Sequence, residues 1–169
     1  MESSIWNIQL GDQIPASALC KKIELECQPE LLAFCRRIEN YFTLHTVNEI
    51  DDQHFELLFM MFGKMVDELT HLFLKEKGLI YPGIQAKGLQ FELQPAVIQQ
   101  IQHTQEKITA LLNRLRQLLN NFQMKPTWSR EWKNCVQDFF QLETKIHQWI
   151  YIEQNMLYPL FCQPTTLHE

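Results

Sequence analysis

The sequence contains one short motif twice, as Glu76-Lys77-Gly78-Leu79-Ile80-Tyr81-Pro82 and as Glu153-Gln154-Asn155-Met156-Leu157-Tyr158-Pro159. Each copy begins with a glutamate and ends with two aliphatic residues followed by Tyr-Pro. Each copy also closes a long segment of helical apolar periodicity. Proline disfavours the continuation of a helix, because it lacks an N–H and restrains the residue before it. The repeat therefore predicts two similar helix ends, and two helical hairpins that make one bundle.

The composition limits the class of protein. The 169 residues are 46% hydrophobic and 21% charged, with only five glycines, which is typical of one helical globular domain. The net charge of −5 argues against nucleic-acid binding. No apolar run approaches the roughly 20 residues of a membrane span, and the first residues do not resemble a signal peptide. The five cysteines form no CxxC pair, which indicates free thiols and a cytoplasmic protein.

Periodicity and turn residues divide the chain into a helical bundle at residues 16–163 and two flanking segments. The predicted segments are an N-terminal arm at 1–15, a first helix at 17–44 with a break near Pro29, a turn at 46–52, a second helix ending near Gly78, a loop at 83–93, a third helix from Pro95, a fourth helix after Thr127, and a tail at 164–169.

Each predicted helix carries an apolar seam, the row of residues at alternating spacings of three and four that faces a bundle core. The four seams are Cys27, Leu31, Phe34, Ile38, Tyr41; Phe55, Leu58, Phe62, Met65, Leu69, Leu72, Glu76, Leu79; Ile98, Ile101, Gln105, Ile108, Leu112, Leu115, Leu119, Phe122; and Cys135, Phe139, Leu142, Ile146, Trp149, Glu153, Met156, Leu160. The fold class predicted is all-α, an up-down-up-down antiparallel four-helix bundle.

Two glutamates occupy the seams at matched positions. In an up-down-up-down bundle the second and fourth helices run in the same direction, so Glu76 and Glu153 lie at one height and point at the same axis. Buried carboxylates at such a place need a metal, a buried cation, a raised-pKa proton or a water-filled pocket. Lys21 reaches about that height on the first helix and is the candidate cation, and Gln105 lies close to it on the third.

The order and spacing of these segments resemble the hemerythrin-like domain family over residues 18–163. The closest likeness is to the di-iron proteins that repair damaged iron–sulfur clusters, in which His-x-x-x-Glu precedes an x-x-x-Leu-Phe-Pro ending on two helices. The resemblance implies a non-haem di-iron centre, held by one histidine from each helix and bridged by two glutamates, and a role in stress response. The residues that carry it are Pro29-Glu30-Leu31, Arg36-Arg37-Ile38-Glu39, Lys75-Glu76, Leu111-Leu112, Asn120-Asn121 and Glu153-Gln154-Asn155.

The chain departs from that family at the histidines. The positions that match the lost ligands carry Lys21, Leu72, Gln105 and Trp149 instead. His71 lies five residues before Glu76, and because true hemerythrins use a His-x-x-x-x-Asp pair, the resemblance keeps it as a metal candidate beside the two glutamates. The remaining histidines do not align with the seams: His103 and His147 should face outward, His45 and His54 belong to the far end, and His168 is in the tail.

Two main hypotheses follow. In the first, a bundle with a degenerate di-iron site is metal-free and acts as a binding or regulatory module with a protein partner, for which Trp128 and Trp132 would be anchors if exposed. In the second, a di-iron cofactor held by displaced ligands serves oxygen, nitric-oxide or iron–sulfur stress chemistry. A third, an enzyme using the glutamates as acid and base, lacks a nucleophile or a substrate pocket in the sequence, so no catalytic residue is assigned. The oligomeric state is left open.

Overall fold

The computed structural model describes residues 4–44 and 52–161, and all regular secondary structure within these ranges is helical. The α-helices are α1 (Ala16–Lys22), α2 (Gln28–Leu44), α3 (Asp52–Lys75), α4 (Tyr81–Lys87), α5 (Pro95–Leu118) and α6 (Arg130–Ile152). Short 3₁₀ segments are η1 (Ile5–Asn7), η4 (Gly88–Gln90), η5 (Asn120–Phe122) and η7 (Tyr158–Phe161). Three π-helical turns are η2 (Ile23–Cys27), η3 (Glu76–Ile80) and η6 (Glu153–Leu157). The all-α prediction is confirmed.

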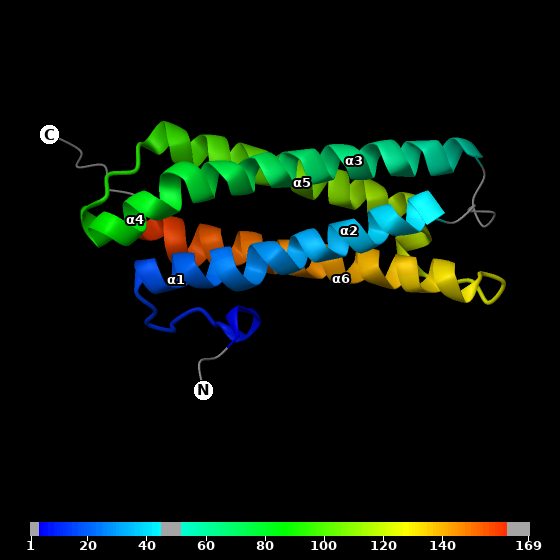
Figure 1. The fold of residues 1–169 in the computed structure, drawn as a ribbon, viewed down its shortest axis with the longest axis horizontal. Coiled ribbons are helices and arrows are strands. Elements are labelled where there is room, and N and C mark those ends of the chain that lie inside the picture. The colour runs from blue at the N-terminus through cyan, green and yellow to red at the C-terminus, as the bar shows by residue number, and fades with distance from the viewer. Residues whose placement is uncertain (1–3, 45–51, 162–169) are drawn as a thin grey trace, which may run out of the picture.

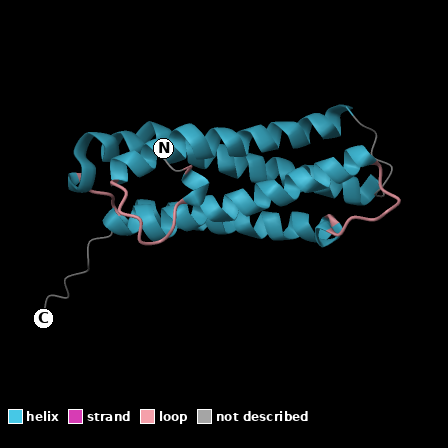
Figure 2. Ribbon diagram, turned by 90° about the horizontal axis from the view of Figure 1, so that it is seen from below, coloured by secondary structure: helices cyan, strands magenta, loops and turns pink. Residues whose placement is uncertain are grey.

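The long helices lie side by side as a bundle, with loops confined to its ends (Figures 1 and 2). Helix α3 packs against α5, and α2 packs against α6. Helices α1 and α4 lie together at one end, where α6 also finishes. No helix in the described ranges has both the length and the apolar character needed to cross a membrane. The predicted turn at 46–52 lies almost wholly outside the described residues, as do His45, His168, Cys162 and the tail at 164–169.

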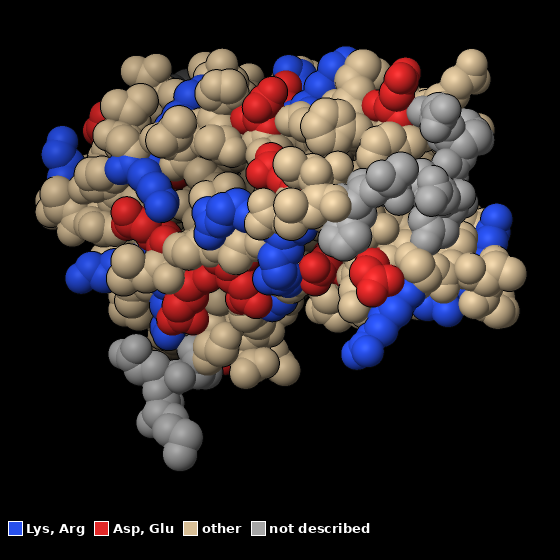
Figure 3. Space-filling view, turned by 45° about the vertical axis from the view of Figure 1, so that its right-hand side comes forward, with Lys and Arg blue, Asp and Glu red and all other residues tan. Residues whose placement is uncertain are grey.

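Ion pairs on the surface join the helices that pack together. Basic and acidic side chains are interspersed over the face in Figure 3. Arg37 Nη2 lies 2.9 Å from Asp138 Oδ1, between α2 and α6, and Lys107 Nζ lies 3.7 Å from Glu68 Oε1, between α5 and α3. Exposed pairs of this kind contribute at most about 1 kcal/mol each, so burial of the apolar seams supplies most of the stability.

Most predicted seam residues are buried or partly buried, and the two that are exposed share one cause. Leu79 is 72% exposed and Leu160 is 47% exposed, so placing them in the core was wrong. A π-turn winds one extra residue into the helix; Leu79 lies inside the π-turn η3, and Leu160 follows the π-turn η6. The side chains beyond each turn are therefore displaced by one position, and Ile80 is buried in place of Leu79.

The chain also remains helical where a loop was predicted. Pro82 occupies the first turn of α4, where a missing N–H is tolerated, so the helix continues to Lys87. Gly88 ends it with φ of 55°, a conformation that glycine adopts without strain. At the N-terminal side, the prediction of a break near Pro29 was wrong: the π-turn η2 precedes this proline and joins α1 to α2 in one continuous helix.

Candidate functional site

A cluster of polar side chains lies inside the α1–α4 end of the bundle, with contributions from all four long helical segments. Glu76 opens η3, Glu153 opens η6, Gln28 opens α2, and Gln105 is in α5. Each of these four side chains is at most 1% exposed. The prediction that Glu76 and Glu153 would be buried together is confirmed.

The π-turns bring two tyrosines onto the same faces as the glutamates. In an α-helix, residues five apart are rotated by about 140°, so Tyr81 would point away from Glu76. In η3 the N–H of Tyr81 donates to the carbonyl of Glu76 five residues earlier, and in η6 Tyr158 does the same to Glu153. Each tyrosine side chain thereby lies on the same helix face as its glutamate and points into the core. Tyr81 and Tyr158 are both at most 1% exposed.

The three π-turns have a common feature in the sequence. A proline directly follows the residue that closes each turn, in Gln28-Pro29, Tyr81-Pro82 and Tyr158-Pro159. In a regular α-helix a proline ring clashes with the carbonyl four residues earlier and removes one hydrogen bond. A wider π-turn just before the proline relieves that clash and lets the helix continue, and π-turns of this kind are frequent at functional sites.

Hydrogen bonds from protein side chains reach all four carboxylate oxygens. Glu76 Oε1 accepts from the Tyr158 hydroxyl at 2.9 Å, and Glu76 Oε2 accepts from Gln28 Nε2 at 2.9 Å. Glu153 Oε1 accepts from the Tyr81 hydroxyl at 2.6 Å, and Glu153 Oε2 accepts from Gln105 Nε2 at 2.7 Å. The Tyr81 hydroxyl also lies 3.1 Å from Glu76 Oε2, so it bridges the two carboxyl groups.

The amide of Gln105 is held in one orientation. Its Oε1 accepts a hydrogen bond from Gln154 Nε2 at 2.8 Å, so its Nε2 must face Glu153. Gln28 is held less completely, because its Oε1 is buried without a partner in the structure. The indole N–H of Trp149 lies beside Glu153 and lowers the pKa of that carboxyl group. No acceptor is placed so that this N–H can donate a hydrogen bond of normal geometry to it.

Burial raises the pKa of both carboxyl groups. The pKa of Glu76 lies well above its ordinary value because of desolvation first and the charge of Glu153 second, and the hydrogen bonds from Tyr158 and Tyr81 offset this only partly. Desolvation raises the pKa of Glu153 to about 7, against hydrogen bonds from Tyr81 and Gln105 that lower it. Desolvation and the nearby carboxylates likewise raise the pKa of both tyrosines, which keeps their hydroxyls protonated.

The pair of glutamates keeps a proton at neutral pH. Burial raises the pKa of both carboxyl groups, that of Glu76 well above its ordinary value, so the two do not both ionise there. The centre then carries one negative charge instead of two, and Tyr81 and Gln105 donate to that charge. Two like charges at this depth would repel each other and be poorly solvated.

Two buried thiols adjoin the cluster. Burial raises the pKa of Cys20 to about 12, and the charges of Glu153 and Glu76 contribute to that shift. Burial and the same two carboxylates raise the pKa of Cys27 well above its ordinary value. Both cysteines are free, and at neutral pH they remain neutral thiols, which are poor nucleophiles.

The other predicted site residues take different positions. Lys21 is exposed, so it is not the buried cation that the pair of glutamates was expected to have. His71 is exposed, as are His54, His103 and His147. Leu72 and Trp149 are buried, and Trp149 packs edge-on against Phe73 with ring centroids 5.1 Å apart. Among the described residues, no three His, Cys, Asp or Glu side chains are grouped so that they could hold a metal ion.

Three members of the cluster were not predicted from the sequence. Gln28, rather than Lys21, is the contribution of the first helix, and Tyr81 and Tyr158 complete the set. A signal for Gln28 was present, because Gln28-Pro29 repeats the position of Tyr-Pro in the two motif copies. Comparison with known protein families finds no matching family model, and comparison with curated proteins finds no significant match.

Proposed function

We propose that this chain is an up-down-up-down bundle of the hemerythrin-like type in which a hydrogen-bonded acidic centre replaces a di-iron site. In this proposal the protein works without metal, as a binding or regulatory module. The observation that carries it is the occupation of every oxygen of Glu76 and Glu153 by a hydrogen bond from a protein donor, at 2.6–2.9 Å. Donor groups stabilise a carboxylate without a cation, so the centre is complete as a proton-sharing pair.

The residues around the pair do not fit a di-iron centre. Such centres use imidazole and carboxylate ligands supported by further hydrogen bonds. Here Leu72 and Trp149 contribute no metal-binding atom one turn before the glutamates, and Gln105 directs its N–H at Glu153 instead of a lone pair. His71 is exposed and does not enter the cluster. A metal would have to displace the hydrogen bonds that hold both carboxyl groups.

A regulatory role is supported by the state of the centre itself. Its charge depends on one shared proton, and the pKa of Glu153 at about 7 places a change of charge near neutral pH. Both glutamates open the π-turns that follow α3 and α6, and the Tyr81 hydroxyl joins their carboxyl groups, so a change of charge there acts where the two helical segments are linked. Trp128 and Trp132 are buried, at 7% and 1% exposed, and are therefore not the partner-binding anchors considered from the sequence.

Iron content tests the proposal. Protein produced in iron-replete cells should contain far less than one iron per chain and show no visible absorption from a non-haem iron centre. Its melting temperature should not change on addition of ferrous iron or a chelator, because a ligand that does not bind the folded state cannot stabilise it. A content near two irons per chain would instead support a working di-iron protein with displaced ligands.

A further inference from the structure

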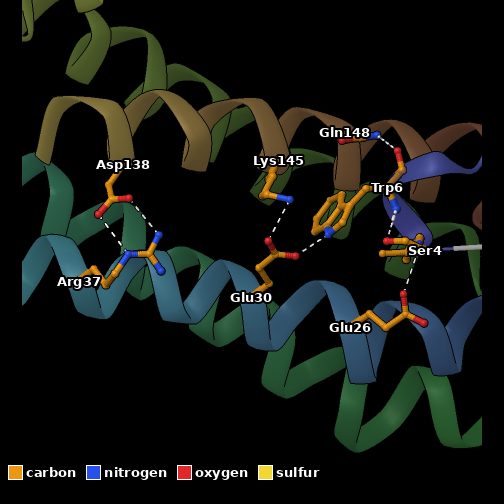
Figure 4. A network of polar contacts seen from close by, with 9 residues as sticks. Ser4, Trp6, Glu26, Glu30, Arg37, Asp138, Lys145 and Gln148 are labelled. Atoms are coloured by element: carbon orange, nitrogen blue, oxygen red, sulfur yellow. Dashed lines mark hydrogen bonds and ion pairs between the residues drawn. The ribbon is translucent and has the colours of Figure 1, made fainter. Parts of the chain in front are cut away.

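The N-terminal arm is fastened across two helices at the level of the acidic cluster. The contacts come from residues 4–8 of the arm, with η1 at their centre, and Ile5 is fully buried in the main core. On one side, the backbone N–H of Ile5 donates to Glu26 at 3.0 Å, and the indole N–H of Trp6 donates to Glu30. Both glutamates belong to the first helix, in η2 and α2 (Figure 4).

On the other side, the arm is held by α6. Gln148 Nε2 donates to the carbonyl of Trp6 at 2.6 Å, and Lys145 Nζ lies 4.1 Å from the centroid of the Trp6 ring. Lys145 also pairs with Glu30 at 3.0 Å. Trp6 is thus enclosed by a clamp of Glu30, Lys145 and Gln148, and the arm bridges the seam between the first helix and α6 (Figure 4).

Cys27 connects this clamp to the acidic cluster. It is fully buried, lies in η2 next to Glu26, and directly precedes Gln28 of the cluster. The charges that act on its thiol are those of Glu153 and Glu76 from the cluster and those of Glu30 and Lys145 from the clamp. Cys27 therefore lies in the chain between Glu26, which holds the arm, and Gln28, which belongs to the cluster, in the turn η2 that η1 contacts.

We propose that the arm is a removable strap that closes the seam between the first helix and α6, and that its release gives solvent and small polar solutes access to Cys27 and to the acidic cluster. The strap is held by a few polar contacts, the Trp6 ring and the buried side chains of Ile5 and Ile8, whereas the four long helices pack on one another without it. Local opening of such a segment requires less free energy than global unfolding. This inference deepens the regulatory role proposed above and rests on it.

Thiol labelling of the full chain tests the strap. The natural chain and Trp6→Ala are exposed to a small thiol reagent under native conditions, and the labelling of each cysteine is followed by peptide mass mapping. Cys135 of α6, which is 4% exposed, serves as the internal reference. Removing the indole should raise the labelling rate of Cys27 relative to that of Cys135 by about tenfold or more. This factor corresponds to a loss of about 1.4 kcal/mol in the free energy that keeps the arm closed.

Two further variants sharpen the result. Glu30→Gln keeps the indole and weakens the clamp, so it should raise the same ratio by a smaller factor. Arg37→Gln breaks the exposed pair with Asp138 between the same two helices, away from the arm, and should leave the ratio unchanged. Equal labelling of Cys27 in all variants would overturn the proposal, as would a parallel rise at Cys27 and Cys135, because the arm would then be part of the global fold. The labelling experiment does not depend on iron content. A negative result would therefore refute the strap without refuting the proposed function, which the iron measurement tests separately.

Discussion

Replacing both buried glutamates by glutamine should make the protein less sensitive to pH and more stable in mild alkali. Desolvation raises the pKa of Glu153 from 4.5 to about 7. A difference of one pKa unit between the folded and the unfolded chain corresponds to about 1.36 kcal/mol. Ionising this carboxyl group in the folded chain therefore requires about 3 kcal/mol more than in the unfolded chain. Glu76, whose pKa lies well above its ordinary value, adds to that cost as the pH rises further.

The sign follows from proton binding. Below about pH 4.5 both carboxyl groups are protonated in the folded and the unfolded chain, and their contribution to stability is fully present. Between there and about pH 7 the unfolded chain releases its protons while the folded chain retains them, so the free energy of unfolding falls as the pH rises. The natural chain should lose about 3 kcal/mol through Glu153 over this range. Glu76 adds a loss of the same sign over this range and above it, because its folded-state pKa lies well above the ordinary value.

Glu76→Gln/Glu153→Gln removes both titrations and keeps polar side chains. The tyrosine hydroxyls can turn from donors to acceptors to meet the new amides. Urea unfolding should therefore give the smaller difference between the two proteins at about pH 5, and a double variant more stable by at least about 3 kcal/mol at about pH 8. A double variant that is less stable at both pH values, with a gap that does not change, would refute the reasoning.

Glu143→Gln is the matched control. Glu143 is also buried on α6, at 2% exposed, but it accepts two hydrogen bonds from Arg116, at 3.0 and 2.7 Å. Because this carboxylate has a cation as partner, its neutralisation should lower the free energy of unfolding throughout the range. Opposite effects of the two substitutions would show that the cluster differs from an ordinary buried ion pair.

Two further predictions concern the π-turn η3 and the positions that align with metal-binding histidines in the proposed resemblance. Ile80→Ala should lower the free energy of unfolding in urea by about 2–5 kcal/mol, whereas Leu79→Ala should change it by less than about 0.5 kcal/mol. A larger loss for Leu79→Ala than for Ile80→Ala would show that the segment keeps the α-helical register and contains no π-turn. The triple variant Leu72→His/Gln105→His/Trp149→His should be less stable than the natural chain without metal, by about 2–5 kcal/mol or more, and should take up iron and melt higher with it; a folded variant that stays metal-free would show that further parts of the site differ.

The sequence predicted the helices and the buried pair because both depend on local signals. Periodicity located the seams, and the repeated motif placed Glu76 and Glu153 at one height, as the structure confirms. The register beyond the glutamates could not be predicted in this way. A count in steps of three and four assumes α-helical geometry, and a π-turn breaks that assumption, which is why Leu79 was assigned to the core and Tyr81 was not.

The partners of the pair were harder to predict. Lys21 was chosen by its height on the first helix, but the buried position belongs to Gln28, which the turn η2 rotates inward. Charge complementarity favoured a lysine, whereas the structure satisfies the carboxyl groups with neutral donors. The contacts of the arm could not be predicted from local patterns, because the hydrogen bonds from Ile5 and Trp6 join residues far apart in the sequence.

Infrared spectroscopy of the carboxyl groups tests the shared proton most directly. A protonated carboxyl has a C=O stretching band that an ionised carboxylate lacks. At neutral pH the exposed glutamates and aspartates are ionised, so such a band must come from a buried, protonated side chain. The natural chain should show it at pH 7, and Glu76→Gln/Glu153→Gln should lack it. A natural chain without the band would mean that both carboxyl groups are ionised, and the centre would then require a cation in place of the proton.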